Sequence, residues 1–253
     1  MLRHIRIIPR LDIKGPHVVK GVHTEGLRIV GIPHKLARSY YEHGADELVY
    51  MDIVASLYQR NLDFDLLRSV ADVVFIPLTV GGGIRTIHDI NNALRAGADK
   101  VAINTHAIKD PSFISEAAKR FGSQCIVLSI EAKKIAPNTW EAYTDGGREK
   151  TGVDAIAWAQ RGIELGAGEL LITSIDKDGT RQGYDTDLLA AINKFSPVPV
   201  IAHGGAGSIE TMDEAVTHGG SDALCASSIF HYGEASIAQI KRSLAEHSYH
   251  VRF

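Results

Sequence analysis

The sequence predicts an α/β fold, a (βα)8 barrel of the TIM type, and two observations support this prediction. Short runs of apolar residues recur eight times along the 253 residues, and a segment with helical spacing follows each run. The first half of the chain also reappears, in order, as the second half. Apolar runs without alternation indicate strands buried on both faces of a parallel sheet. Eight such units with an internal repeat favour a closed barrel over an open doubly wound sheet.

The expected strands are rich in β-branched residues and apolar along their whole length. They span residues 5–11, 47–53, 76–80, 100–104, 125–130, 169–175, 198–202 and 223–227.

The segments between them repeat apolar residues with a period near 3.6. In residues 86–97 the apolar positions share one face, and Gly97 supplies the stop. In residues 110–122, Asp110 can cap the helix and Pro111 fits its first turn. The remaining helices are expected near 33–43, 62–71, 152–165, 185–194, 208–218 and 234–247.

Composition excludes several classes of protein. Lys and Arg number 27 against 30 Asp and Glu, a net charge of −3, which argues against nonspecific binding to nucleic acid or to an anionic membrane. With 45% hydrophobic residues and two cysteines, the chain is neither disordered nor a disulfide scaffold. No run is long enough to span a membrane, and no signal-peptide core is visible. We therefore expect a cytoplasmic protein.

The internal repeat is the strongest signal in the sequence. The segment at 44–53, GADELVYMDI, matches GAGELLITSI at 166–175, which begins 122 residues later. The glycine pair at 82–83 matches the pair at 204–205 at the same offset. Several matches in order at a nearly constant offset indicate a duplicated half-barrel. We expect one domain over residues 1–253, with half-barrels at about 1–122 and 123–253.

Each half carries the same two motifs at strand ends. One strand ends in glycines, and the next ends in small polar residues, Asn104-Thr105 or Ser227-Ser228. Glycines let backbone N–H groups approach an anion, and neighbouring hydroxyls add donors. Because barrels commonly bind phosphate after strands seven and eight, the duplication predicts a second phosphate site across the mouth. The substrate would then carry a phosphate at each end; the alternative is that the glycines only form tight turns.

The first strand of each half ends in a carboxylate, Asp12 in one half and Glu131 in the other. These two strands face each other across a barrel, so both groups are expected to point into the mouth. A carboxylate pair across a bound substrate is a plausible general acid and base. The alternative is a pair of surface carboxylates.

Residues 14–31 are long for a βα loop and rich in glycine, which is typical of a mobile lid. Lys20 on this segment is expected to reach a phosphate or the reacting centre. The alternative is an exposed, solvated lysine.

Charged residues also begin several strands, at the opposite end of the barrel. They are Arg6, Glu47, Lys100 and Glu169. Charges at the bottom of a packed barrel are costly unless they are paired or hydrated. We expect a salt-bridge ring that closes the floor, and the functional alternative is a gate or passage through it.

Several motifs together resemble one family over essentially the whole chain. They are IIPRLDIKG, VVKG, GADELVYMDI, IPLTVGGGI, RAGADKVAIN, RFGSQCIV, GAGELLITSIDKDGT, HGGAG, ASSIFHYGE and the terminal HVRF. The sequence resembles the cyclase subunit of imidazole glycerol phosphate synthase. The related histidine-pathway sugar isomerase shares the half-barrel plan, but SIDKDGTRQGYD and FGSQ look like the cyclase.

The resemblance implies a lyase/cyclase in histidine biosynthesis. A separate glutaminase subunit docked at the barrel floor would supply ammonia, which attacks a bis-phosphorylated ribulosyl aminoimidazole carboxamide ribotide. Ring closure and cleavage would give imidazole glycerol phosphate and an aminoimidazole carboxamide ribotide. Nothing in the sequence indicates a metal or an organic cofactor.

The resemblance also assigns residues to roles. One phosphate would be held by Gly83, Asn104 and Thr105, and the other by Asp178, Gly179, Gly205, Ser227 and Ser228. Asp12 would be one catalytic acid or base. The family's gate for ammonia would comprise Arg6, Glu47, Lys100 and Glu169, with Asp99 near the glutaminase interface.

Four residues depart from the family's pattern. Glu131 stands where the family has aspartate, Arg10 where it has cysteine, His203 where it has serine and Ser129 where it commonly has alanine. The extra methylene of Glu131 moves its carboxyl by about 1.5 Å, and misplacement on the order of 1 Å can cost about a hundredfold in rate. Arg10 and His203 are expected to join Lys20 at the substrate. Their clustering favours altered chemistry over neutral drift.

Two functions therefore remain open. The first is a working cyclase. The second is a diverged paralogue that passes glutaminase-derived ammonia to another acceptor, such as a sugar amidotransferase in surface-polysaccharide biosynthesis, with weak or no cyclase activity. A non-enzymatic barrel is a weaker third option, because intact phosphate loops would then have no purpose.

Overall fold

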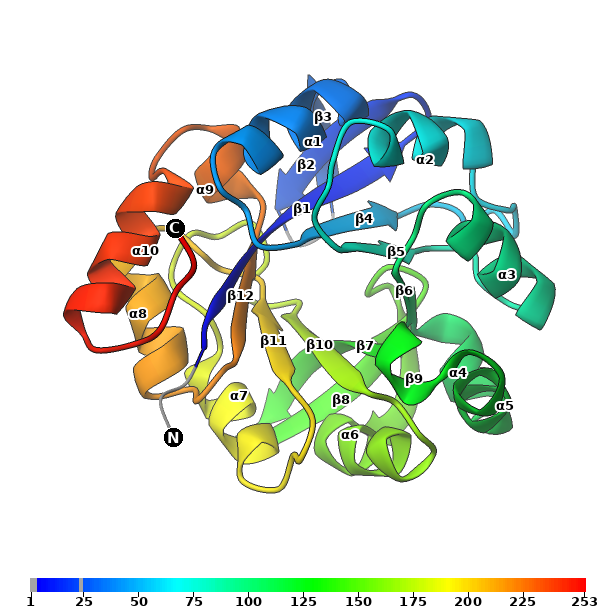
Figure 1. The fold of residues 1–253 in the computed structure, drawn as a ribbon. Helices are drawn as coiled ribbons and strands as arrows, with labels where there is room; N and C mark the ends of the chain where they lie inside the picture. The colour runs from blue at the N-terminus through cyan, green and yellow to red at the C-terminus, as the bar shows by residue number, and fades with distance from the viewer. Residues whose placement is uncertain (1–3, 23–24) are drawn as a thin grey trace.

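The computed structural model describes residues 4–22 and 25–253 and confirms the predicted barrel. Eight parallel strands form a closed ring with helices outside it (Figure 1). In ring order they are β1 (Arg6–Lys14), β4 (Leu48–Asp52), β5 (Leu78–Gly81), β6 (Lys100–Ile103), β7 (Ile126–Ala136), β10 (Glu169–Ser174), β11 (Val200–His203) and β12 (Ala223–Ala226). Closure comes from the pairing of β12 with β1 on one side and of β7 with β10 on the other.

The predicted helices form the outer ring. They are α1 (Pro33–Glu42), α2 (Phe64–Ala71), α3 (Ile87–Arg95), α5 (Ser112–Phe121), α6 (Ala155–Glu164), α7 (Thr186–Asn193), α8 (Ile209–Thr217) and α10 (Ile237–Glu246). The repeat extends to their caps: Thr86 begins α3 and Ser208 begins α8 with the same reciprocal capping box. Asp110 accepts a hydrogen bond from the N–H of Ser112 at the start of α5.

The loops after the fourth and eighth barrel strands also match between the halves. Each begins with a short helix, which is α4 (Thr105–Lys109) in the first half and α9 (Ser228–His231) in the second. In the first half, a 3-10 turn, η1 (Ser123–Cys125), comes just before β7. Asn104 and Ser227 are the N-cap residues of these short helices and adopt similar backbone angles.

Residues 14–31 were expected to form a long glycine-rich loop, and this conformation is wrong. The segment forms an antiparallel hairpin, β2 (His17–Val22) and β3 (Glu25–Gly31), in which β2 pairs with β1. Pairing satisfies backbone N–H and C=O groups that a loop would leave to water. His23 and Thr24, which belong to the predicted lid, lie outside the described residues.

A second hairpin, not anticipated from the sequence, follows β7. It consists of β8 (Thr139–Thr144) and β9 (Glu149–Asp154), and β8 pairs with the extended end of β7. Each half-barrel therefore extends its first strand into a hairpin beside the mouth.

Alternate residues of the strands point into the barrel and form layers along its axis. The charged residues at the strand starts form the floor. Above them lies an apolar layer, separate from the larger core between strands and helices, comprising Ile8, Val49, Ala102, Val127, Leu171, Ile201, Ala223 and Cys225. Burial raises the pKa of Cys225 to about 12, so this thiol packs as a small apolar group.

Within residues 4–22 and 25–253, we find no helix with the length and apolar character needed to span a bilayer.

Candidate active site

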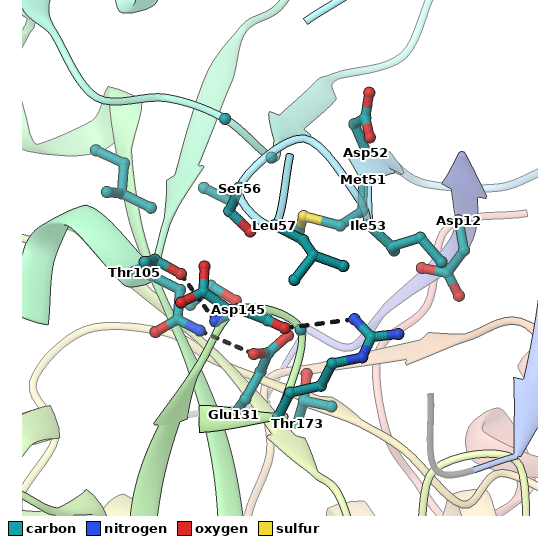
Figure 2. Close-up of a pocket in the computed structure, with 18 of the residues that line it drawn as sticks. Asp12, Met51, Asp52, Ile53, Ser56, Leu57, Thr105, Glu131, Asp145 and Thr173 are labelled. Carbon is teal, nitrogen blue, oxygen red and sulfur yellow. Dashed lines mark hydrogen bonds between the residues drawn. The ribbon is translucent and has the colours of Figure 1, made fainter. Parts of the chain in front are cut away.

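A cavity of about 330 Å³ opens at the carboxyl ends of the barrel strands. Asp12 at the end of β1 and Glu131 on the opposite strand β7 both line it. Figure 2 shows their carboxyl groups, with Thr105 and Asp145 beside Glu131. The two carboxylates therefore share one cavity and are not surface groups.

The first glycine pair borders this cavity. Gly82 has φ +98°, and a Cβ atom there would lie 2.1 Å from the backbone oxygen of Asp52, so only glycine fits. Gly83, Asn104 and Thr105 also line the cavity. The Thr105 hydroxyl accepts a hydrogen bond from the N–H of Asp145, which leaves its own hydrogen available to a ligand.

The second glycine pair borders a smaller space. Its walls include all five residues expected at the second phosphate: Asp178, Gly179, Gly205, Ser227 and Ser228. The hydroxyl oxygen of Ser227 is buried and has no hydrogen-bond partner among the described residues. The space measures about 10 Å³, room for about one water.

The side chain of Lys20 forms part of the wall of this second space. Its ammonium group lies 2.8 Å from Oδ1 of Asp178 and 3.7 Å from Oδ2 of Asp12, and the residue is 5% exposed. Lys20 is therefore not a solvated surface lysine. The hairpin also packs directly on the loop after β10, because a Cβ atom at Gly179 would lie 2.4 Å from the backbone oxygen of Gly21.

Arg10 holds Asp12 from the other side. Its Nε lies 2.7 Å from Oδ1 of Asp12, and both side chains are buried. Burial alone would raise the pKa of Asp12, but the charges of Arg10 and Lys20 and the hydrogen bond from Arg10 outweigh it. The pKa of Asp12 is therefore below its ordinary value, and the group is ionised at neutral pH.

Glu131 has the opposite electrostatics. Burial raises its pKa to about 7, although Arg10 and the N–H of Gly147 favour the charged form, and the negative charges of Asp178 and Asp12 add to the rise. Its Oε2 accepts a hydrogen bond of 2.9 Å from Asn104. Two carboxyl groups with pKa values displaced in opposite directions are typical of an acid/base site.

His203 lies between the two cavities and lines both. Its Nδ1 is 3.3 Å from a terminal nitrogen of Arg10 and 3.2 Å from the hydroxyl of Thr173 on β10. The four residues that depart from the family's pattern, Arg10, Ser129, Glu131 and His203, all line the larger cavity. They thus form one contiguous site.

The floor residues form a closed ring of ion pairs. Arg6 contacts Glu47 at 2.7 Å and Glu169 at 2.5 Å, and Lys100 contacts the same two carboxylates at 3.0 and 2.9 Å. Each charge therefore has two partners of opposite sign, as the structural interpretation of the sequence expects. The apolar layer separates this ring from the cavity.

Asp99 is exposed at the same end of the barrel. Its carboxylate accepts the N–H of Leu78 at the start of β5, so it has a structural role there. Asp46 accepts the N–H of Ile7 in the same way.

Two features of the site were missed in the sequence. The first is the hydrogen bond from Asn104 to Glu131. The second is the hairpin that brings Asp145 and Gly147 over that carboxyl. The internal repeat could have indicated this hairpin. Residues 14–31 are long for a connection after the first strand of the first half, so a long connection was also to be expected after the first strand of the second half.

Comparison with known proteins identifies the family. Residues 6–236 match the family described as histidine biosynthesis protein. The chain belongs to this family. Over 247 residues it is 51% identical to the imidazole glycerol phosphate synthase subunit HisF of Streptococcus mutans, and the match covers 98% of each chain.

A second relative carries the same name. Over 209 residues the chain is 56% identical to the imidazole glycerol phosphate synthase subunit HisF of Legionella pneumophila, a match that covers 83% of this chain and 99% of the relative. These matches confirm the family resemblance drawn from the motifs. Neither relative's name refers to a sugar amidotransferase.

Proposed function

We propose that this chain is the cyclase subunit of imidazole glycerol phosphate synthase. It uses ammonia to convert a bis-phosphorylated ribulosyl aminoimidazole carboxamide ribotide into imidazole glycerol phosphate and an aminoimidazole carboxamide ribotide, in histidine biosynthesis. The observation that supports this most is that the two glycine pairs related by the repeat both border spaces at the barrel mouth, and that Asp12 and Glu131 line the larger of these spaces.

The substrate spans the mouth from one glycine pair to the other. One phosphate binds at Gly83, Asn104 and Thr105, where the cavity is already open. The other binds at Gly205 and the serines after β12, beside Lys20. The ammonium group of Lys20 has three N–H donors, so it can contact the phosphate and keep its contact with Asp178.

The two carboxyl groups have different roles in the reaction. Glu131, with a pKa of about 7, can both donate and accept a proton at neutral pH. As the nitrogen of ammonia bonds to the carbonyl carbon, Glu131 protonates the carbonyl oxygen. It then moves a proton from that nitrogen to the new hydroxyl group, which leaves as water when the C=N bond forms. Asp12 stays ionised and stabilises the positive charge that develops on that nitrogen.

Ammonia enters through the floor. The ion-pair ring of Arg6, Glu47, Lys100 and Glu169 opens towards a glutaminase partner, and the apolar layer conducts neutral ammonia rather than ammonium. Two floor residues suit a docking surface. Asp99 is exposed there, and Phe75, just before β5, is 81% exposed.

The test is turnover by the purified chain. With ammonium and the bis-phosphorylated substrate, the wild type is expected to release imidazole glycerol phosphate. With the partner glutaminase added, glutamine should replace ammonium as the nitrogen source. Failure to release product at saturating ammonium would contradict the proposal.

One observation favours the second candidate function. Arg10 binds a catalytic carboxylate directly, at 2.7 Å, and so alters the reaction centre. A paralogue that passes ammonia to a sugar amidotransferase would keep the floor ring and need no cyclase chemistry. Glutamine-dependent amination of that acceptor, without imidazole glycerol phosphate formation from ammonium, would establish this function instead.

A further inference from the structure

The side chain of His203 is held at one ring nitrogen only. A terminal nitrogen of Arg10 donates to Nδ1 at 3.3 Å, and the hydroxyl of Thr173 lies 3.2 Å from the same atom. Within residues 4–22 and 25–253, no group hydrogen-bonds to the other ring nitrogen, Nε2. The residue is 4% exposed, and it lines both the large cavity and the space beside the second glycine pair.

The contact with Arg10 determines the position of the imidazole proton. A guanidinium group has N–H donors and no acceptor, so Nδ1 must offer its lone pair. A neutral ring then carries its proton on Nε2. The Thr173 hydroxyl adds a second donor on the Nδ1 side.

Arg10 is itself fixed by Asp12. Its Nε donates to Oδ1 of Asp12 at 2.7 Å, which orients the guanidinium plane and directs its terminal nitrogen to His203. The contacts thus run from Asp12 through Arg10 to His203 and Thr173, on strands β1, β11 and β10.

The surrounding charges disfavour the imidazolium form. Charged groups from several elements lie at this part of the site: Arg10 and Asp12 from β1, Lys20 from β2, Asp178 from the loop after β10, and Glu131 from β7 across the cavity. Burial and the positive charges of Arg10 and Lys20 hold the pKa of His203 well below its ordinary value.

We infer that His203 is a neutral hydrogen-bond donor, through Nε2, to an anionic ligand at the second glycine pair. Arg10 is the positioning residue that sets this tautomer. The identity of the ligand rests on the proposed function, whereas the tautomer does not. A neutral donor between Asp12 and an anion site contacts ligand oxygens without adding a further positive charge beside Arg10 and Lys20.

The tautomer is tested by NMR on the full chain labelled with ¹⁵N-histidine. Long-range ¹H–¹⁵N correlations distinguish Nε2–H, Nδ1–H and imidazolium, and loss of one set of signals in His203→Gln assigns the residue. We expect the Nε2–H pattern, unchanged from pH 6 to pH 9. In Arg10→Met the pKa of the ring should rise, because one of the two positive charges is removed, or the ring should populate both tautomers. An Nδ1–H ring, or an imidazolium at pH 7, in the wild type would overturn the inference.

The ligand contact is tested with inorganic phosphate. We expect His203→Leu to weaken phosphate binding about tenfold or more, because it removes a hydrogen bond to a charged group. His203→Gln keeps an N–H donor near the Nε2 position and should stay within about threefold of wild type. His88→Leu, on the exposed face of α3, is the matched control and should change nothing.

Equal phosphate affinity in wild type and His203→Leu, or no binding by the wild type, would overturn the ligand contact. Neither result depends on cyclase turnover. Failure of this inference is therefore distinguishable from failure of the proposed function, which the ammonium assay decides.

Discussion

Asn104 donates a hydrogen bond of 2.9 Å to Oε2 of Glu131, so one amide joins the first proposed phosphate site to the carboxyl whose pKa is about 7. The same amide group lies 3.1 Å from the backbone oxygen of Tyr143 on the hairpin after β7. Strand β6, strand β7 and the hairpin thus meet at one side chain.

Asn104→Ala should therefore affect binding and proton transfer together. The loss of a hydrogen bond to the charged form raises the pKa of Glu131 further, and the carboxyl loses its orientation. We expect kcat/KM for the ammonium-dependent reaction to fall by about tenfold to a hundredfold, with the pH optimum displaced upwards. The rate–pH profile measures both effects. Asn91→Ala on the surface of α3 is the control, and equal profiles for the two variants would contradict this role.

Glu131→Gln should remove the proton-transfer group while keeping its shape. We expect kcat to fall by about 10²- to 10⁴-fold, the usual contribution of a general acid or base. The wild-type rate should decline as pH rises through about 7, where Glu131 loses its proton. Steady-state kinetics from pH 5.5 to 9 test this, and a decline at the same pH in the variant would assign the titration to another group.

The same substitution should make stability less dependent on pH. Because the pKa of Glu131 rises from 4.5 to about 7 on folding, the native state holds this proton more tightly than the unfolded state does. The stabilisation is fully present below pH 4.5 and is lost as pH rises through about 7. At about 1.4 kcal/mol per pKa unit, the loss is at most about 3.5 kcal/mol. Urea unfolding at pH 5 and pH 8 should show the wild type losing stability relative to Glu131→Gln, and parallel changes would refute the assignment.

Lys100→Met should affect the glutamine-dependent reaction without affecting the ammonium-dependent reaction. It leaves Glu47 and Glu169 with Arg6 alone and opens the floor ring. We expect the ammonium-dependent rate to stay within about twofold, because the cavity is untouched, while glutamine-dependent turnover with the partner changes several-fold. Lys119→Met, on α5, is the control. A parallel loss of both activities would show that the ring serves stability alone.

Lys20→Met should weaken substrate binding, because it removes the positive charge beside the second proposed phosphate site. Asp178 then remains buried without its ammonium partner, which should cost about 3 kcal/mol or more of stability. We expect KM for the bis-phosphorylated substrate to rise at least tenfold, measured alongside the free energy of unfolding in urea. Lys20→Arg keeps the charge and should recover part of both losses. An unchanged KM in Lys20→Met would exclude Lys20 from the phosphate site.

The barrel and its mouth were predictable from the chain because both depend on local patterns. Apolar runs without alternation predict buried parallel strands, and the repeat of segments 44–53 and 166–175 predicts closure. Since strand ends meet at one rim, the positions of Asp12 and Glu131 also followed from their places after the first strand of each half.

The hairpins could not be predicted in the same way. Residues 17–22 and 25–31 alternate weakly and contain several glycines, so their pairing with β1 depends on an edge that the barrel itself presents. Lys20 illustrates the consequence. Nothing in the sequence around Lys20 shows that its side chain is buried. The hairpin places it between Asp12 and Asp178.

The sequence by itself determined the family, the doubled barrel and the set of residues gathered at the mouth, because these follow from periodicity, strand order and motif. The tertiary structure decided which charges meet: Arg10 with Asp12, Asn104 with Glu131, and Arg10 with Nδ1 of His203. Those pairings join residues up to 193 positions apart. Their effects on pKa depend on distance and burial, which arise only when the strands close into a ring.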